Sequence, residues 1–128
     1  MDVEIYDESR IVRSASNCIL DKHMNELPQP AVVDLDLPTV LAALADPVRL
    51  AIVRELHDRR EVMCGALHLD VAKSTRSHHL KVLREAGVTW TRVEGVERYV
   101  TLRYTCLDKR FPGLLTSVLG SIPNASVR

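Results

Sequence analysis

The chain has 128 residues, a length that suits one domain able to bury a core without disulfides or metals. Its composition, 46% hydrophobic and 27% charged, is ordinary for a soluble globular protein. No apolar run approaches the roughly 18 residues of a membrane helix, and the N-terminus lacks the features of a secretory signal. Three widely spaced cysteines, Cys18, Cys64 and Cys106, favour reduced thiols over a disulfide framework. We therefore expect a cytoplasmic protein without membrane contact.

The formal net charge is zero, but the charges are unevenly distributed. Residues 1–46 hold nine Asp or Glu against three Lys or Arg, whereas residues 47–110 hold thirteen Lys or Arg against eight Asp or Glu. A basic middle segment can bind phosphate even when the whole chain is neutral. An ordinary solvated basic face is the alternative that charge alone leaves open.

The first 35 residues are expected to form an N-terminal arm. Apolar residues from Ile11 to Ile19 recur at helical spacing, which allows a helix over about residues 7–27 that Pro28 and Pro30 would end. Disorder of this arm is the alternative.

Two helices with proline in the first turn should follow. Asp36 can cap a helix over about residues 37–44, and Asp46 can cap a second one over about residues 47–56. The charged stretch after Leu56 is expected to end the second helix.

The middle of the chain predicts two more helices and a hairpin. A short helix is expected over about Val62–Leu67, and a longer one over about Lys73–Ala86, which Gly87 would terminate. Residues 88–93 and 98–103 are rich in Val, Thr, Tyr and Trp around a turn, which is typical of a β-hairpin.

A short apolar helix over about Phe111–Leu119 should complete the domain. The order α-α-α-α-β-β-α is a mostly helical α+β arrangement with the parts of a winged helix-turn-helix. We expect this DNA-binding and dimerisation domain over residues 36–119, an arm over residues 1–35 and a tail over residues 120–128.

The start of the 73–86 helix is unusually rich in hydrogen-bonding groups, and the major groove of B-DNA admits one α-helix whose N-terminal residues reach base edges. The hairpin adds two cations that can meet phosphates or the minor groove. We expect DNA contacts from Lys73, Ser74, Thr75, Arg76, Ser77 and His78 on the helix and from Arg92 and Arg98 on the hairpin. The alternatives are a capped, solvated helix start and a hairpin with ordinary surface charge, since its tip also carries acidic residues.

Three stretches resemble the ArsR/SmtB-type repressors: ADPVRLAIV at 45–53, KSTRSHHLKVLREAG at 73–87 and the Glu94-Gly95 turn. The resemblance covers about residues 37–119. It implies a homodimer that binds a palindromic operator and releases this double-stranded DNA when an inducer binds. It also implies that the terminal helices form the dimer interface. The DNA-reading positions that it implies are Ser74, Thr75, Ser77 and His78.

A symmetric dimer is also expected from the residues themselves. The 111–119 helix carries four large apolar groups, more than a lone short helix can hide on one domain. The expected interface consists of Leu37, Val40, Leu41, Leu44, Leu114, Leu115, Val118 and Leu119.

The sequence departs from the family at several positions. Ala72 stands where a serine usually caps the recognition helix, and Arg76 stands at a position that is usually apolar. Metal-sensing members often carry a Cys-x-Cys pair or ligands on the last helix, and neither is present here. If the short helix continues to His68, Cys64 and His68 would lie one turn apart and could supply two ligands of a thiol sensor. We expect no metal site and no cofactor, with Cys64 as a small buried apolar residue; a metal or metalloid inducer is the alternative.

An enzyme is not expected. Cys64 and His68 are the only local candidates for a nucleophile and its base, and no glycine-rich oxyanion or phosphate loop accompanies them. The other function left open is a winged-helix module for protein–protein association without an operator of its own.

Overall fold

The computed structural model describes Leu27 and residues 29–122, so the helix expected over about residues 7–27 lies almost entirely outside the described residues. Five α-helices, two single turns of 3-10 helix and three strands make up the described part. In chain order they are η2 (Val32–Asp34), α3 (Leu37–Leu44), α4 (Pro47–Arg59), β1 (Val62–Met63), η3 (Cys64–Ala66), α5 (Lys73–Ala86), β2 (Thr89–Glu94), β3 (Glu97–Leu102), α6 (Tyr104–Arg110) and α7 (Leu114–Ser121). This order confirms the expected mostly helical winged helix-turn-helix fold.

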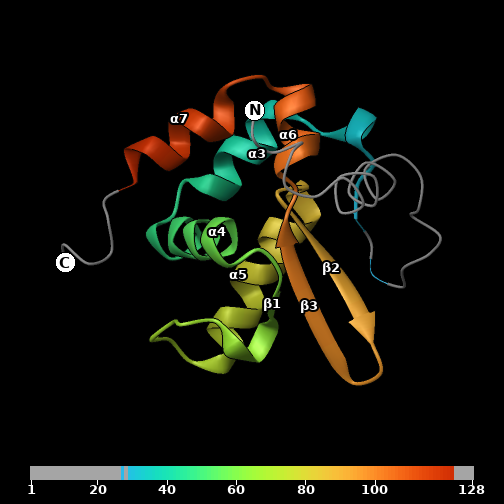
Figure 1. The fold of residues 1–128 in the computed structure, drawn as a ribbon, viewed down its shortest axis with the longest axis vertical. Helices are drawn as coiled ribbons and strands as arrows, with labels where there is room; N and C mark the ends of the chain where they lie inside the picture. Colours follow the sequence, from blue (N-terminus) through green and yellow to red (C-terminus); the bar gives the residue numbers. More distant parts are fainter. Residues whose placement is uncertain (1–26, 28, 123–128) are drawn as a thin grey trace.

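Figure 1 shows how the elements are arranged. Helices α3, α6 and α7 gather at one end of the molecule, α4 and α5 lie below them, and the β2–β3 hairpin extends toward the other end (Figure 1). This hairpin, Thr89–Leu102, is called the wing below. Its tip lies at the same end of the molecule as the segment that leads into α5 (Figure 1).

Aspartate caps begin α3 and α4, as expected. The carboxylate of Asp36 accepts a hydrogen bond from the backbone N–H of Thr39 at 3.1 Å. The carboxylate of Asp46 accepts from the backbone N–H groups of Val48 and Arg49 at 2.8 and 3.1 Å. Each helix also has proline in its first turn, where the missing N–H costs no hydrogen bond.

The end of α5 is fixed by glycine. Gly87 adopts φ +89°, which is a left-handed conformation. The backbone N–H groups of Gly87 and Val88 donate hydrogen bonds to the carbonyl oxygens of Arg84 and Leu83 in the last turn of the helix. A Cβ at Gly87 would lie 2.1 Å from Cδ2 of Leu35, which itself is buried. The turn after α5 therefore requires glycine, because both the left-handed backbone and the close approach of Leu35 exclude a side chain.

The small sheet has the order β1-β3-β2, with both pairs antiparallel. The short helix expected over Val62–Leu67 is wrong: Val62 and Met63 form β1, and only one 3-10 turn follows. Val62 pairs with Val100 of β3, and both side chains are buried, so pairing with a distant strand overrides the local pattern.

Helix α6 was not expected from the sequence. It begins after Arg103 with no side-chain cap, so no start signal marks it, yet Cys106 and Leu107 are buried on its inner side. The last helix is shorter at its start than expected, since α7 begins at Leu114 after Gly113, which adopts φ +84°.

One hydrophobic core joins the helices to the sheet. Its fully buried members include Ile52, Val53 and Leu56 of α4, Leu83 of α5, Val40 of α3, Val88, Val100 of β3, Leu107 of α6 and Leu115 of α7.

Residues of the expected arm pack against this domain, and Leu35 is buried in its core. The side-chain amide of Gln29 accepts a hydrogen bond from the backbone N–H of Thr91 at 2.7 Å and donates one to the carbonyl oxygen of Thr91 at 2.9 Å. Gln29 thus covers part of the free edge of β2.

Candidate nucleic-acid interface

The first two turns of α5 present polar side chains to solvent. Five of the six residues expected there are exposed, namely Lys73, Ser74, Thr75, Ser77 and His78, and Arg76 is half-buried. The inner side of the helix is fixed because Leu80 and Leu83 are buried in the core. Ala72 stands at the cap position, so no side-chain hydrogen bond from this residue caps the start of α5.

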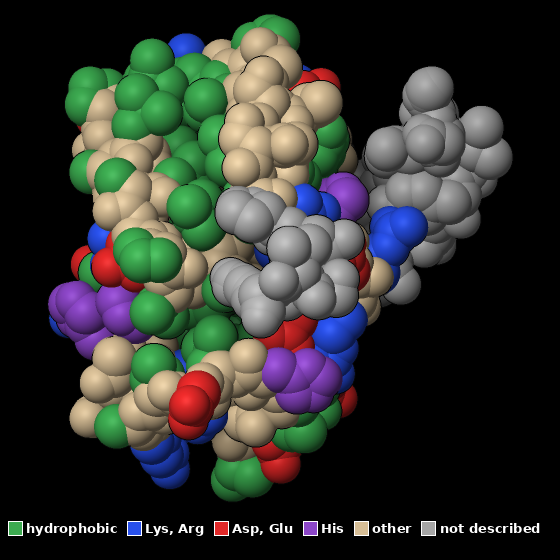
Figure 2. All heavy atoms as spheres, turned by 90° about the vertical axis from the view of Figure 1, so that its left-hand side faces the viewer, with side chains coloured by type: hydrophobic (Ala, Val, Ile, Leu, Met, Phe, Trp, Pro, Cys, Tyr) green, Lys and Arg blue, Asp and Glu red, His purple; other side chains and the backbone are tan. Residues whose placement is uncertain are grey.

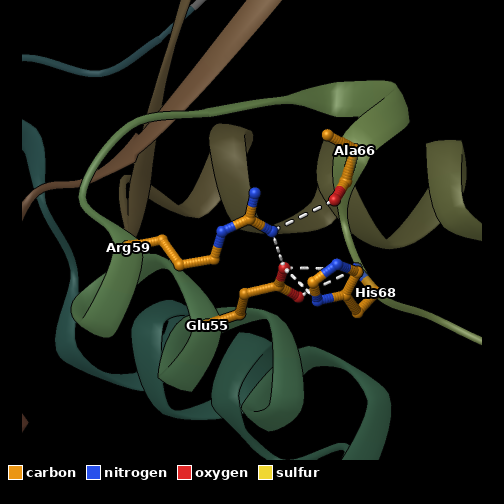
Figure 3. Close-up of polar contacts among 4 residues, drawn as sticks. All are labelled: Glu55, Arg59, Ala66 and His68. Carbon is orange, nitrogen blue, oxygen red and sulfur yellow. Dashed lines mark hydrogen bonds and ion pairs between the residues drawn. The ribbon is translucent and has the colours of Figure 1, made fainter.

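The segment before α5 is fastened by a carboxylate of α4. Both oxygens of Glu55 accept from the backbone N–H of His68, at 3.0 and 3.2 Å, and Nδ1 of His68 lies 3.4 Å from one of them (Figure 3). Arg59 donates to the same carboxylate and, at 3.1 Å, to the carbonyl oxygen of Ala66. Glu55 therefore fastens the connection that leads into α5, a role that the sequence pattern did not assign to it.

These contacts also bear on the thiol-sensor candidate. The helix does not continue from Cys64 to His68, because only a 3-10 turn spans Cys64–Ala66 and Leu67 is extended. The expected spacing of one helical turn between Cys64 and His68 is therefore wrong, and the imidazole of His68 faces Glu55 instead (Figure 3).

Arg92 of the wing is engaged by two carboxylates. It donates to both oxygens of Glu61 and to Glu94, and its guanidinium lies 4.6 Å from the centroid of the Tyr99 ring. The hydrogen bonds to Glu61 and Glu94 raise the pKa of Arg92 above its usual value. This arginine is charged, but its charge is already paired with the carboxylates of Glu61, which precedes β1, and Glu94, in the wing.

The strand register places Arg98 on the other face of the hairpin. Arg92 pairs with Tyr99, so these two share one face, whereas Arg98 alternates to the face of the buried Val100, which is the face that packs on the helices. The side chain of Arg98 is exposed and, within the described part of the chain, forms no hydrogen bond or ion pair. The two arginines that looked equivalent in the sequence therefore differ in their availability to a phosphate.

Cys64 lies among cations near this second face. Burial raises the pKa of the Cys64 thiol, while the positive charges of Arg98, Arg76 and Arg84 oppose that rise. Arg76 and Arg84 belong to α5 and Arg98 belongs to β3, so the three charges come from the recognition helix and the wing. Cationic side chains thus collect where the helix and the wing approach one another.

The residues expected at a dimer interface divide into two groups. Val40, Leu44, Leu115 and Leu119 are buried inside the domain, so the domain itself covers half of them. Leu37 and Leu41 are 41% and 45% exposed, and Leu114 and Val118 are partly buried. Figure 2 shows hydrophobic side chains gathered over the end of the molecule that carries α3 and α7 (Figure 2).

Metal ligands, membrane-spanning helices and free thiols are the remaining features that the sequence raised. No group of three or more His, Cys, Asp and Glu side chains in the described part could hold a metal ion. None of the described helices is both long and apolar enough to cross a membrane. Cys64 is a free thiol, whereas Cys106 is buried and disulfide-bonded, so the expectation of reduced cysteines is wrong for Cys106.

Comparison with known proteins identifies a family and a relative of this chain. A sequence family described as a helix-turn-helix domain matches residues 44–89, which span α4, β1, η3 and α5. An uncharacterized HTH-type transcriptional regulator of Bacillus subtilis (strain 168), YceK, is 39% identical over 82 residues, which are 62% of this chain and 82% of the relative. The matched family region contains the exposed start of α5 and the segment held by Glu55.

Proposed function

Because the chain belongs to the HTH-type transcriptional regulators, which bind DNA, we propose that it acts as a homodimeric repressor of the ArsR/SmtB type. In this proposal the dimer binds a palindromic operator in the cytoplasm and releases it when an inducer binds. The protein performs no catalytic step, and residues 36–119 form the unit that binds DNA and dimerises.

The observation that carries the proposal is the exposed start of α5. Two successive turns of polar side chains stand on a helix whose opposite side is locked into the core, a geometry that fits the major groove. Ser74, Thr75, Ser77 and His78 would read base edges, and Lys73 and Arg76 would contact phosphates. Arg98 is the wing residue best placed to meet the DNA backbone, because Arg92 is paired within the wing.

The exposed apolar residues of α3 and the partly exposed ones of α7 support the dimer. Leu37, Leu41, Leu114 and Val118 lie on helices at one end of the molecule, away from the wing tip (Figure 1). A pair of subunits joined there would present two recognition helices related by a twofold axis, which is the symmetry of a palindrome.

Selection of bound sites from a random pool of duplex DNA tests the proposal. We expect the full chain to enrich a palindromic sequence with two half-sites. Enrichment of a sequence without internal symmetry would contradict the dimeric mode of reading. No enrichment, together with weak binding at every salt concentration, would favour a winged-helix module for protein association, since phosphate neutralisation gives a steep salt dependence.

A further inference from the structure

A single arginine of α4 contacts both α3 and α5. Nε of Arg49 donates to the carbonyl oxygen of Ala43 at 2.6 Å, and Nη2 donates to that of Ala42 at 3.4 Å. Nη1 of the same guanidinium lies 3.1 Å from Nδ1 of His79. Ala42 and Ala43 belong to the last turn of α3, and His79 belongs to α5, so three helices meet at Arg49.

The chemistry of the two groups fixes the direction of the contact. A guanidinium has donors only, so Nδ1 of His79 must accept the hydrogen bond and its proton must reside on Nε2. The carboxylate of Asp46, which accepts the backbone N–H of Arg49, is close enough that the positive charge of Arg49 acts on it. The contact is thus a charge-assisted hydrogen bond to a neutral imidazole in a partly buried place.

The location of His79 gives this contact a consequence for DNA reading. His79 follows Ser77 and His78 directly, and unlike them it is only half-exposed, because it turns toward α4. The rotation of α5 about its own axis decides which side chains of its first two turns face outward. Arg49 ties that rotation to the end of α3, the helix that carries the exposed Leu37 and Leu41.

We propose that Arg49 and His79 form a positioning pair that fixes the recognition helix relative to the dimer helix α3. This inference rests on the proposed function, in which two copies of α5 read two half-sites. The pair would set the distance and angle between the two reading helices, and hence the half-site spacing that the dimer accepts. Neither residue needs to contact DNA for this role.

The test uses variants that separate the hydrogen bond from the fold. His79→Leu removes the acceptor, whereas His79→Asn keeps an oxygen at about the place of Nδ1. His57→Leu is the matched control, because His57 is an exposed histidine of α4 without a contact to α5. Each full-length variant is titrated with the selected operator and with versions whose half-sites are one base pair closer or farther apart. Thermal unfolding of each variant reports on the fold.

We expect His79→Leu to bind the operator about tenfold more weakly and to lose most of the preference for the original spacing. His79→Asn and His57→Leu should keep both the affinity and the spacing preference. If His79→Leu does not fold, Arg49→Lys gives the same information, since the single ammonium nitrogen of lysine does not reproduce the fixed positions of the two guanidinium nitrogens that contact Ala43 and His79. It should also relax the spacing preference.

Two outcomes would overturn the inference. The first is a folded His79→Leu or Arg49→Lys variant that binds with the parent's affinity and spacing preference. The second is a loss in His79→Asn as large as that in His79→Leu. A parent protein that selects no DNA would instead contradict the proposed function on which the inference rests. The behaviour of the parent therefore separates the two failures.

Discussion

The guanidinium of Arg92 and the carboxylate of Glu61 form a two-point contact across the sheet, with Nε and Nη2 of Arg92 lying 3.2 and 3.1 Å from the two oxygens of Glu61. Glu61 directly precedes β1, and Arg92 lies on β2, so the contact spans the central strand β3. The wing is thereby joined to the start of the segment that connects α4 to α5. Because such forked pairs have restricted geometry, Arg92 is a structural residue of the wing.

The first prediction separates the two wing arginines. Arg98→Gln should weaken DNA binding and reduce the slope of log affinity against log salt by about one unit, since one phosphate contact is lost. Arg92→Gln, the matched control, should leave that slope unchanged, because Glu61 and Glu94 already balance its charge. Titrations at several salt concentrations check this. A reduced slope for Arg92→Gln alone would show that the opposite face of the wing meets the DNA.

The second prediction concerns the reading helix. Ser77→Ala and His78→Ala should each cost about 1–3 kcal/mol of operator affinity and relax the preference at one base pair. The stability of either variant should change by less than about 0.5 kcal/mol, because both side chains are exposed. Binding to single-base operator variants measures the preference, and Lys109→Ala on α6 serves as an exposed control. Parent-like preference in both variants would place the reading surface on another element.

The third prediction concerns the dimer. Leu41→Glu and Val118→Glu should each give a folded monomer, because a charge buried between two subunits without a partner is costly. Val96→Glu at the wing tip, where the side chain is 95% exposed, should leave the dimer intact. Light scattering at micromolar concentration distinguishes these states. A monomeric parent protein under the same conditions would contradict the proposed interface.

The fourth prediction follows from the cap of α4. Partial burial disfavours the charged form of Asp46, but the backbone N–H groups of Arg49 and Val48 outweigh this and hold the pKa of Asp46 below its ordinary value. The carboxylate therefore stabilises the folded state fully above the unfolded pKa of about 3.9, and this stabilisation is lost as the pH falls through the folded pKa.

Asp46→Asn should accordingly be less stable than the parent at neutral pH, and the difference should shrink as the solution is acidified. Urea unfolding at neutral pH and at about pH 3 measures it. Asp70→Asn, at an exposed position before α5, is the control and should show a smaller difference. A difference between Asp46→Asn and the parent that does not vary with pH would contradict the role of the charged cap.

The fifth prediction concerns Cys64. Because burial raises the pKa of its thiol, little thiolate forms at neutral pH, and alkylation should be slower in the native protein than in urea. Cys64→Ser should bind the operator like the parent and, if this thiol senses a metal, arsenite or an oxidant, should no longer release DNA on that treatment. Peptide mass analysis after timed alkylation measures the rate at this residue. Equal rates in native and unfolded protein would show an activated thiol.

Local signals in the sequence were sufficient for the helices that form the frame of the site. Asp36 and Asp46 cap within their own helices, and Gly87 ends α5 through its own backbone conformation, so each boundary depends only on neighbouring residues. Strand β1 was missed because its two residues acquire their conformation from Val100 and Tyr99 of a distant strand. Helix α6 was missed because no capping side chain precedes it.

The sequence pattern could not decide how side chains divide between roles. Leu114 and Leu115 look alike in the sequence, yet Leu115 fills the core while Leu114 remains partly exposed. Arg92 and Arg98 flank the same turn, and only the register shows that they lie on opposite faces. Hydrophobic spacing indicates that a helix face is covered, but it does not indicate whether the chain itself or a second subunit covers it.

Direct titration of the full chain with its selected operator and with a scrambled duplex of the same length and composition tests the central claim. Sequence-specific reading by α5 predicts an affinity for the operator at least about 10³-fold higher than for the scrambled duplex at physiological salt. It also predicts that a variant carrying both Ser77→Ala and His78→Ala loses most of that ratio while keeping its affinity for the scrambled duplex. Equal affinity of the parent protein for the two duplexes would contradict the account.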